Sequence, residues 1–250
     1  MKSNFTAVIL AAGKGTRLNC QKENKVTKKL AGKPMISYTA DLLKKTNIDS
    51  IVVVIGFAQK SVKQILGDKY IYAVQKKPLG TGNAVLSALP HLPQTCQHVL
   101  VLNADDSAFY QPKDLNKLIN THLKNKADMS LLTVIKDNPN RLGRIIRDQN
   151  KKVSAIVEFK NATEQQRKIK EVNTATYCFK KEFLQAYLPQ VKPNPVSQEY
   201  YLTDLLAIAV KNNKQVNAVK LSQPSRFQGV NTKEDLQLAE QKMKQKINEH

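Results

Sequence analysis

Short apolar segments rich in β-branched residues alternate with amphipathic segments through the first half of the sequence. The apolar segments predict buried strands at Phe5–Ala12, Ser50–Gly56, Tyr70–Val74, His98–Leu102 and Met129–Ile135. The segments between them have apolar residues at helical spacing and predict helices at Pro34–Lys45, Gln59–Leu66, Thr81–Leu89 and Pro112–Lys124. Because strands connected through helices run parallel, this alternation predicts an α/β fold: a mixed, mostly parallel sheet flanked by helices on both faces.

The second half of the chain changes character. Its predicted strands are Gly143–Arg147, Val153–Phe159 and Thr174–Phe179, joined by loops and by a polar helix at Thr163–Lys168. An apolar helix spans Thr203–Lys211 with Thr203 as its N-cap, and a final helix opens at Thr232, with Asp235 completing a variant capping box. With no internal repeat and no linker, we expect one domain at 1–250, made of halves at about 1–125 and 126–231 and a C-terminal helix at 232–250.

The chain carries a formal net charge of +20, with 40 Lys and Arg against 20 Asp and Glu. A charge of this size attracts polyanions, which makes nucleic acid a partner to consider. The lysines are nevertheless spread along the whole chain, without a long basic block or a patch interleaved with aromatic residues. We therefore interpret most of them as solubilising surface, do not expect a nucleic-acid partner, and expect the field to draw in triphosphates.

The sequence contains no segment that predicts export or membrane insertion. The apolar run Phe5–Ala12 leads into Gly13-Lys14-Gly15 rather than a small-residue cleavage site, and no apolar stretch approaches the roughly 20 residues that a membrane span needs. Cys20, Cys96 and Cys178 are odd in number, far apart and without a C-x-x-C pair, which argues against a disulfide framework or a zinc site. We expect a cytoplasmic protein with no membrane partner.

A glycine loop follows the first predicted strand, with the sequence Leu10-Ala-Ala-Gly-Lys-Gly-Thr-Arg-Leu18. Small residues there let backbone N–H groups approach a phosphate or a base closely. The loop is not a P-loop, because no Gly-Lys-Ser/Thr follows at the required spacing, and it is not the dinucleotide fingerprint, because Leu18 stands where the third glycine belongs. Taken alone, an ordinary strand-to-helix turn explains the loop about as well as a phosphate site does.

The whole string Leu-Ala-Ala-Gly-x-Gly-Thr-Arg resembles the signature of the sugar-1-phosphate nucleotidyltransferases. Further matching motifs follow in order over nearly the full length: Lys25-Val26, Leu30-Ala-Gly-Lys-Pro-Met35, Gln75 with Leu79-Gly-Thr-Gly82, Asn103-Ala-Asp105, Gly143-Arg-Ile145, Ile156-Val-Glu158, Glu171-Val-Asn-Thr174, Glu199-Tyr-Tyr-Leu-Thr-Asp204 and Gly229-Val-Asn231. Within the family, the chain most resembles the uridyltransferase domain of the bacterial bifunctional N-acetylglucosamine-1-phosphate uridyltransferases. The resemblance implies a Rossmann-like fold of the nucleotide-diphospho-sugar transferase type, with a nucleotide-binding first half and a sugar-binding second half.

The resemblance implies a reaction in which an oxygen of N-acetylglucosamine 1-phosphate attacks the α-phosphorus of UTP and pyrophosphate leaves in line. The attacking oxygen is already ionised at neutral pH, so the protein has to position the two anions and neutralise their charge. Arg17 is expected to clamp the triphosphate tail and Lys25 to act at the α-phosphate, as the catalytic cations. The expected ligands of Mg²⁺ are Asp105, which follows a core strand, and Asn231.

The resemblance also implies two sets of binding residues. The nucleotide-binding set is Leu10, Ala11, Ala12, Gly13, Gln75, Gly80 and Thr81, in which Gln75 and Thr81 face the uracil edge. The sugar-binding set is Gly143, Glu158, Asn173 and Thr174, and Tyr201 and Thr203 are expected to position that wall. Other interpretations stay open: Arg17 and Lys25 as surface bases, Asp105 with Asp106 as a turn cap, Gln75 as an exposed loop residue, and Glu158 as the partner of a surface lysine.

Several residues depart from the family pattern. They are Asn24 for a proline before the active lysine, Asn103-Ala104 for Tyr-Gly before the metal aspartate, Asp106-Ser107 for Val-Pro after it, and Ala175 for a glycine beside the sugar pocket. The methyl group of Ala175 could crowd an N-acetyl group, so another sugar 1-phosphate, such as glucose 1-phosphate, or another nucleotide, such as dTTP or CTP, is an alternative. An alternative of another class is a non-catalytic nucleotide- or nucleic-acid-binding regulatory protein. The sequence lacks the hexapeptide repeats of a left-handed β-helix acetyltransferase domain, so we expect no acetyl-CoA activity.

Overall fold

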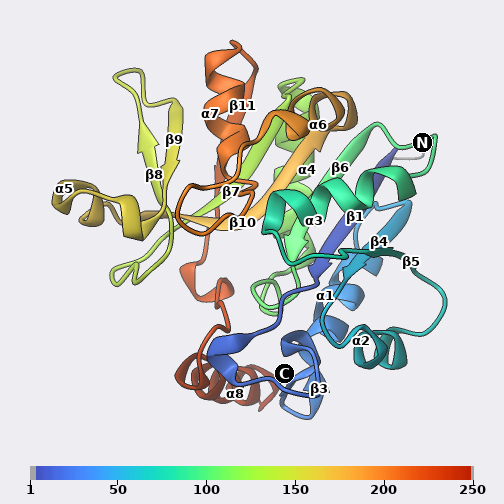
Figure 1. The fold of residues 1–250 in the computed structure, drawn as a ribbon. Coiled ribbons are helices and arrows are strands. Elements are labelled where there is room, and N and C mark those ends of the chain that lie inside the picture. Colours follow the sequence, from blue (N-terminus) through green and yellow to red (C-terminus); the bar gives the residue numbers. More distant parts are fainter. Residues whose placement is uncertain (1–3, 249–250) are drawn as a thin grey trace.

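The structure, a computed structural model, describes residues 4–248 and places a central sheet between layers of helices (Figure 1). The strands are β1 (Phe5–Ala11), β2 (Lys29–Leu30), β3 (Lys33–Pro34), β4 (Ser50–Ile55), β5 (Ile71–Val74), β6 (His98–Asn103), β7 (Met129–Ile135), β8 (Arg144–Arg147), β9 (Val153–Val157), β10 (Glu171–Lys180) and β11 (Val216–Lys220). The α-helices are α1 (Met35–Lys44), α2 (Gln59–Leu66), α3 (Thr81–Ala88), α4 (Pro112–Lys124), α5 (Glu164–Arg167), α6 (Lys181–Tyr187), α7 (Asp204–Lys211) and α8 (Lys233–Asn248).

A nine-stranded sheet runs through the described residues in the order β11-β7-β10-β6-β1-β4-β5, with β8 and β9 attached beside β10. β1 lies near the middle and pairs in parallel with β4 and β6, while β5 pairs in parallel with β4, and β11 with β7. On this path only β10 runs against its neighbours, β6 and β7. The predicted mixed, mostly parallel sheet is therefore confirmed.

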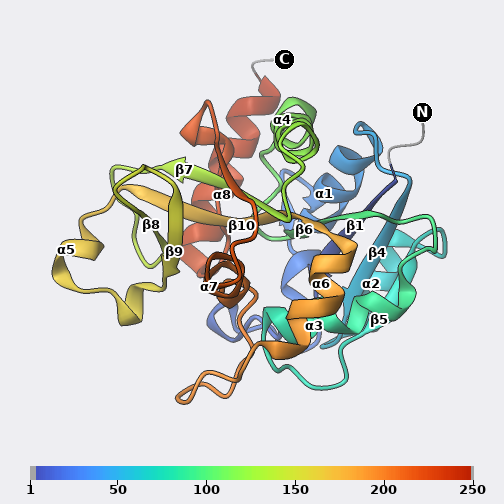
Figure 2. The ribbon, with the colours of Figure 1, turned by 90° about the horizontal axis from the view of Figure 1, so that it is seen from above.

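Alternate residues of each strand face opposite layers, so the sheet has a separate core on each face. One core packs Ile9 and Leu102 against α1, α2 and α4. The other packs Val8 and Val101 against α3, α6 and α7. Figure 2 shows α1 and α4 on one side of the sheet and α3, α6 and α7 on the other. Since β1 has no solvent-facing side, its sequence is apolar except for Thr6, as burial on both faces requires.

A third, smaller core lies beyond the end of β1. In it, Ala239 and Met243 of α8 pack against Leu18 and Leu30, and the backbone N–H of Ala31 donates to Glu240 Oε2 at 2.7 Å. The C-terminal helix is thus docked on the segment that follows the glycine loop (Figure 1). This docking brings the start of α8 close to the carboxyl edge of the sheet.

The hairpin of β8 and β9, together with α5, forms an arm that extends away from the helical layers (Figure 1). Arg144 is buried at the base of this arm, where its guanidinium donates to the backbone oxygens of Asn140 at 3.0 Å and Arg167 at 3.2 Å and also to that of Leu142. The guanidinium also lies over the ring of Phe159, 5.4 Å from its centroid. Arg144 therefore fastens α5 and the turn before β8 to the wall that Phe159 forms.

The predicted elements of the first half agree closely with the structure, and α2, α4 and β7 have the predicted bounds. The predictions did not include α6 or β11. α6 follows β10 without a turn, so no turn-forming residues mark its start in the sequence. β11 is a short strand at the sheet's edge, with polar residues in its sequence. None of the helices within residues 4–248 is both long and apolar enough to cross a membrane.

A buried polar chain links β6, α4 and β7. His98 Nδ1 lies 3.2 Å from His122 Nε2, and His122 Nδ1 lies 2.9 Å from Ser130 Oγ. Burial, with smaller contributions from the charges of His98 and Lys180, lowers the pKa of His122 to about 3. His122 is therefore neutral in the folded protein at neutral pH.

We expect acid to destabilise the protein through this chain. A histidine in the unfolded chain has a pKa of about 6.5. The stability that depends on neutral His122 is therefore complete above about pH 6.5 and falls by up to about 1.4 kcal/mol per pH unit as the pH drops toward the folded pKa. In urea denaturation, His122→Gln should reduce the loss of unfolding free energy between about pH 6 and pH 4, whereas His91→Gln, at an exposed position, should not. An unchanged slope in His122→Gln would contradict this expectation.

Candidate functional site

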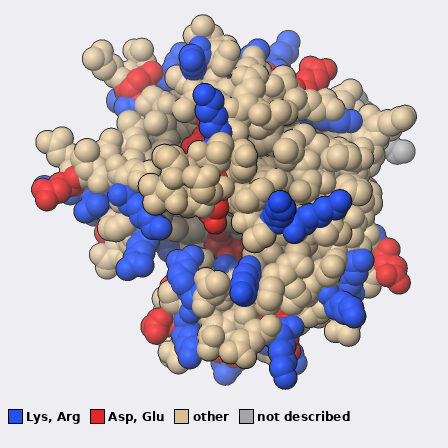
Figure 3. Space-filling model, viewed as in Figure 1, with Lys and Arg blue, Asp and Glu red and all other residues tan. Residues whose placement is uncertain are grey.

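The carboxyl ends of β1, β4, β5 and β6 meet at one edge of the sheet, because these strands are parallel neighbours. Leu10 of β1 is paired with Asn103 of β6, so the glycine loop and the segment that carries Asp105 leave the sheet side by side. A cleft of about 990 Å³ opens there and reaches the arm. Figure 3 shows it as a hollow with acidic atoms inside and basic side chains around it. Ligand sites of open α/β sheets lie at this edge.

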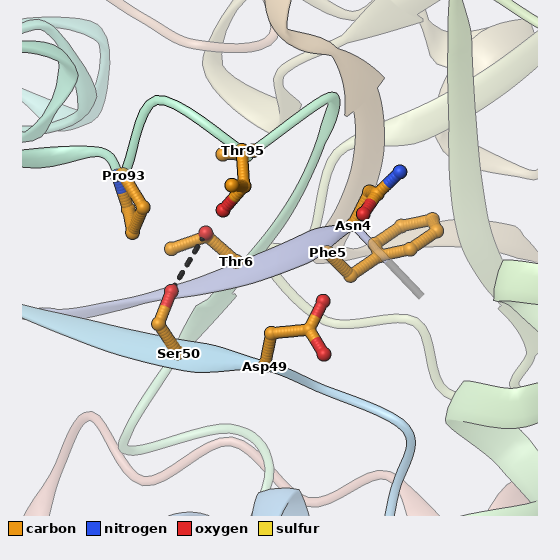
Figure 4. Close-up of a pocket in the computed structure, with 8 residues that line it drawn as sticks. Asn4, Phe5, Thr6, Asp49, Ser50, Pro93 and Thr95 are labelled. Carbon is orange, nitrogen blue, oxygen red and sulfur yellow. Dashed lines mark hydrogen bonds between the residues drawn. The ribbon is translucent and has the colours of Figure 1, made fainter. Parts of the chain in front are cut away.

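A smaller cavity of about 250 Å³ lies at the opposite edge, where β1 and β4 begin (Figure 4). Thr6 Oγ1 and Ser50 Oγ lie 2.8 Å apart on its floor, and Pro93 and Thr95 form its far side. No residue that the sequence analysis predicted for a site lines this cavity. The candidate functional site is therefore the large cleft.

The side chain of Asn24 holds the glycine loop in place. It is fully buried, and its Nδ2 donates to the backbone oxygens of Ala11 at 2.9 Å and Phe57 at 2.8 Å, while its Oδ1 accepts from the N–H of Val26 at 3.1 Å. One carboxamide thus joins the loop after β1, the loop after β4 and the turn of Lys25. In the sequence, Asn24 is only a departure from the family pattern, and this role is not predicted. Its position directly before Lys25 was the available signal.

The two glycines of the loop serve different purposes. Gly15 has a left-handed backbone, with φ of +64°, and a Cβ there would lie 2.8 Å from Lys25 Cβ. A Cβ at Gly13 would meet nothing within 4 Å, so Gly13 borders open space. Within residues 4–248, the backbone N–H groups of Gly13, Lys14 and Gly15 donate to no acceptor. A run of unpaired N–H groups beside open space suits an anion.

We expect Gly15→Ala to destabilise the protein and Gly13→Ala to leave its stability nearly unchanged. The left-handed conformation costs a residue with a Cβ about 1–2 kcal/mol, and at Gly15 the clash with Lys25 adds to that cost. Thermal unfolding of the two variants beside the parent chain measures the difference. Equal melting temperatures for the two variants would show that the stability of the fold does not depend on the left-handed backbone of Gly15 and its close approach to Lys25.

Charged side chains from distant parts of the sequence converge beside this loop. Lys25 Nζ donates to Asp105 Oδ2 and, at 3.3 Å, to Asn231 Oδ1, which also accepts from Arg17 Nη2 at 3.0 Å. Burial alone lowers the pKa of Lys25, but the charge of Asp105 and the hydrogen bond to it, followed by the charge of Asp106, raise that pKa above its ordinary value. Lys25 is therefore a cation. Arg17 lines the cleft, whereas Lys25, Asp105 and Asn231 do not line it and are connected to Arg17 through the contacts of Asn231.

Asp105 and Asn231 carry the hard side-chain oxygens that Mg²⁺ prefers. Their side-chain oxygens both contact the ammonium group of Lys25, so the pair already converges on a positive charge. Residues 4–248 contain no group of three or more His, Cys, Asp and Glu placed to hold a metal ion. An ion bound here would therefore take most of its ligands from amide oxygens, phosphates and water, as Mg²⁺ commonly does.

The start of α8 fixes the position of Asn231. Asp235 Oδ2 accepts from the backbone N–H of Asn231 at 3.0 Å and from that of Thr232 at 2.9 Å. Thr232 Oγ1 in turn accepts from the N–H of Asp235 at 3.2 Å. The predicted capping box is therefore present, and it anchors a predicted metal ligand as well as a helix.

Asp106 is a site residue that the sequence analysis left out. Its Oδ2 accepts from Asn103 Nδ2 at 2.9 Å, and burial, together with the charge of Asp105, raises its pKa to about 7. A Cβ at Gly229 would lie 2.8 Å from Asp106 Oδ1, so the carboxylate would have to shift if residue 229 carried a side chain. The signal that could have revealed Asp106 was its pairing with Asp105 directly after a core strand.

The arm side of the cleft carries the predicted sugar residues. Gly143, Glu158, Asn173 and Thr174 all line it. A Cβ at Gly143 would lie 3.0 Å from Ile156 Cγ2 and 3.4 Å from Glu158 Oε1, so Gly143 gives the carboxylate room. Glu158 pairs with no lysine among residues 4–248, and burial, with a contribution from Asp204, raises its pKa.

Asn173, Thr174 and Ala175 form a bulge in β10. Asn173 Nδ2 donates to the hydroxyl of Tyr177 at 2.7 Å, and Thr174 Oγ1 donates to the backbone oxygen of Leu132 at 2.8 Å. The ladder to β7 shifts register between Asn173 and Tyr177, and Ala175 has a φ of +54° within the bulge. A left-handed residue is easiest for glycine, which explains the glycine of the family pattern at this position.

The predicted uracil residues lie mostly behind the cleft wall. Gln75 is buried, so its interpretation as an exposed loop residue is wrong, and its Nε2 donates to the backbone oxygen of Gly80 and to Asn83 Oδ1, each at 3.0 Å. A Cβ at Gly80 would lie 2.7 Å from the backbone oxygen of Tyr200. Thr81 lines the cleft, and its Oγ1 accepts from the N–H of Leu202 at 3.0 Å. These contacts bind the start of α3 to the segment before α7.

Comparison with known proteins gives one family. The family model described as nucleotidyl transferase matches residues 6–224. The chain is 39% identical over 241 residues to the bifunctional protein GlmU of Geobacillus sp. (strain WCH70), covering 96% of this chain and 52% of the relative. It is 41% identical over 235 residues to the bifunctional protein GlmU of Heliobacterium modesticaldum, covering 94% of this chain and 50% of the relative. The chain thus spans about half the length of these curated relatives.

Solved structures share the fold. A putative glucose-1-phosphate thymidylyltransferase from Bacillus anthracis superimposes with a TM-score of 0.80 at 23% identity, covering 95% of this chain and 94% of that one. The crystal structure of apo-UDP-glucose pyrophosphorylase superimposes with a TM-score of 0.78 at 19% identity, covering 97% of this chain and 98% of that one. The Rossmann-like arrangement expected from the sequence is therefore confirmed.

Proposed function

Because this chain belongs to the nucleotidyl transferase family, we propose that it transfers a uridylyl group from UTP to N-acetylglucosamine 1-phosphate, with Mg²⁺, and releases pyrophosphate. The products are UDP-N-acetylglucosamine and pyrophosphate. Relatives about 40% identical over almost the whole chain carry the name bifunctional protein GlmU, which supports this choice of substrates. The same chemistry with another sugar 1-phosphate or another nucleotide is the closest alternative.

The observation that carries the proposal is the convergence of Arg17, Lys25, Asp105 and Asn231 at the mouth of the glycine loop. These residues lie up to 214 positions apart in the sequence, so only the fold brings them together. Two cations next to two oxygen ligands are what a metal-bound triphosphate requires. Unpaired N–H groups at Gly13, Lys14 and Gly15 add donors for the phosphates or the base.

In the proposed reaction, an oxygen of the sugar phosphate forms a bond to the α-phosphorus of UTP, and the bond from that phosphorus to the bridging oxygen of pyrophosphate breaks. Lys25 neutralises charge at the α-phosphate, and Arg17, with its forked donors, holds the leaving phosphates. Asp105 and Asn231 would hold Mg²⁺, which would supply further neutralisation of the phosphate oxygens. The attacking phosphate oxygen carries no proton to remove, so the site needs no strong general base.

The arm side of the cleft is the proposed sugar pocket. Glu158 accepts a sugar hydroxyl there, and its room beside Gly143 supports this role. Asn173 and Thr174 are already hydrogen-bonded to the chain, so their part is to shape the bulge and to present backbone groups. Gln75 uses both donors within the chain and therefore offers the uracil only its acceptor oxygen. We place the protein in the cytoplasm, which its buried, unpaired cysteines support.

The test of this function is a substrate panel. Purified protein is incubated with each pairing of UTP, dTTP, CTP, ATP and GTP with N-acetylglucosamine, glucose and galactosamine 1-phosphates, and the release of pyrophosphate is measured with and without Mg²⁺. We expect the highest kcat/KM for UTP with N-acetylglucosamine 1-phosphate and no turnover after chelation. Turnover of another pairing would replace the substrates and keep the chemistry. If no pairing reacts, the proposed activity is wrong.

Removal of one metal ligand or one cation should stop the chemistry without unfolding the protein. We expect Asp105→Asn and Lys25→Ala each to lower kcat roughly 100- to 1,000-fold, because each removes charge stabilisation that forms at the transferring phosphate. Asp41→Asn, which breaks a surface ion pair with Lys33 and Lys44, serves as the control and should keep normal turnover. Undiminished activity of Asp105→Asn would rule out its role at the metal.

Substitution of Glu158 should weaken sugar binding selectively. A hydrogen bond to a charged acceptor contributes about 1.5–3 kcal/mol, so Glu158→Gln should raise the KM for the sugar phosphate at least roughly tenfold, with little change in the KM for UTP. Because burial raises the pKa of Glu158, the KM of the parent enzyme should begin to rise on acidification at a higher pH than for an exposed glutamate. Glu164→Gln, at an exposed position, is the control. An equal rise in both KM values would place Glu158 outside the sugar pocket.

A further inference from the structure

Asp106 is a buried carboxylate that has no role in the proposed reaction. It is 9% exposed, yet it lines the cleft. Its Oδ2 accepts from Asn103 Nδ2 at 2.9 Å, whereas Oδ1 accepts no hydrogen bond from any residue within 4–248. The contact with Asn103 is an ordinary turn contact and uses one oxygen. Oδ1 is not one of the side-chain atoms that are fully buried without a partner, so it is open to the cleft and available to a ligand.

The free oxygen lies beside a predicted metal ligand. A Cβ added to Gly229 would lie 2.8 Å from Asp106 Oδ1 and 3.4 Å from Asn231 Nδ2. Asp106 Oδ1 and the amide group of Asn231 therefore both border the position that a side chain of residue 229 would occupy. The backbone oxygen of Asp105 also accepts from the N–H of Val230 at 3.2 Å, which holds the two segments together.

The local charge is unbalanced. Asp105 and Asp106 are adjacent buried carboxylates, and Lys25 makes an ion pair with Asp105 only. Arg17 contacts Asn231 instead, and Asp106 forms no ion pair with any of the described residues. Two carboxylates in a poorly solvated site repel each other, and one ammonium group balances only one of them. A divalent cation among Asp105, Asp106 and Asn231 would supply the missing charge.

We propose that Asp106 supplies a third protein oxygen to the divalent cation, through Oδ1, beside Asp105 and Asn231. The inference rests on the proposed function, which provides the metal. It predicts a site with more negative charge than one carboxylate and one amide would give, and so a higher affinity for the bare ion. Hard oxygen ligands of this kind suit Mg²⁺ and Mn²⁺.

The first test measures the binding of Mn²⁺ to the full chain without substrates, from the decrease of the free-ion signal in electron paramagnetic resonance. Asp106→Asn preserves shape and can still accept from Asn103, so its melting temperature without metal should not fall. We expect Mn²⁺ to bind about tenfold more weakly to Asp106→Asn and to lose measurable binding to Asp105→Asn. Equal affinity of the parent and Asp106→Asn overturns the inference, and so does a parent chain that binds no Mn²⁺.

The second test separates direct ligation from a distant effect of charge. Thiolates prefer softer ions, so Asp106→Cys titrated with Cd²⁺ should give the ultraviolet charge-transfer band of a cadmium–thiolate bond. The parent chain, with its three buried cysteines, gives the background. Ser107→Cys is the matched control, because the Ser107 hydroxyl contacts Thr39 Oγ1 at 2.8 Å and the Asn103 backbone oxygen at 2.8 Å, away from the metal ligands. A band in Ser107→Cys equal to that in Asp106→Cys, or no band in Asp106→Cys, shows that Asp106 is not a ligand.

The two proposals fail in different ways. If Asp105→Asn binds Mn²⁺ and turns over like the parent, the metal site of the proposed function is wrong. If Asp105→Asn loses both properties while Asp106→Asn keeps the parent affinity, only the role of Asp106 is wrong.

Discussion

The parallel pairing of β1 with its neighbours β4 and β6 determines where every element of the site lies. Leu10 faces Val54 on one side and Asn103 on the other, so the loops after the three strands leave the sheet at the same height. A slip of one residue in either pairing would turn the side chains of β1 to the wrong core, so burial on both faces fixes this register. The convergence of the glycine loop and Asp105 is therefore a consequence of how the apolar core packs.

Packing alone does not position charged groups, and polar contacts complete the arrangement. Asn24 ties the loops after β1 and β4 to the turn of Lys25, and the capping box of α8 holds Asn231. Both anchors use backbone groups as partners, so they hold the position of a functional residue without occupying its side chain. The overall charge of the protein also favours phosphate binding at this site. A chain with a net charge of +20 attracts phosphates, while buried carboxylates select where a cation can sit.

Sequence reasoning gave the layers of the fold because strands buried on both faces carry an unambiguous pattern. It missed β11, which lies at the sheet's edge and needs only one apolar face, and α6, which begins where β10 ends. At the site, Arg17, Lys25, Asp105 and Asn231 could be predicted together only from their separate motifs. The roles of Asn24 and Gly229 could not be predicted from the sequence, because each depends on a tertiary neighbour. Asn24 contacts the backbone of Phe57, and Gly229 lies beside the carboxylate of Asp106.

The departures from the family pattern are of two physical kinds. Asn24 and Ala175 concern the backbone: Asn24 replaces the rigidity of a proline with hydrogen bonds, and Ala175 keeps a left-handed conformation that glycine adopts more easily. Neither changes the charge of the cleft. Asp106 does change the charge of the cleft. Its carboxylate lies where Gly229, which has no side chain, leaves room, so the backbone around Asp105 and Asn231 need not move to admit it. The difference between this chain and the family pattern is therefore concentrated in the electrostatics next to the proposed metal ligands, whereas the proposed sugar pocket keeps its carboxylate at Glu158.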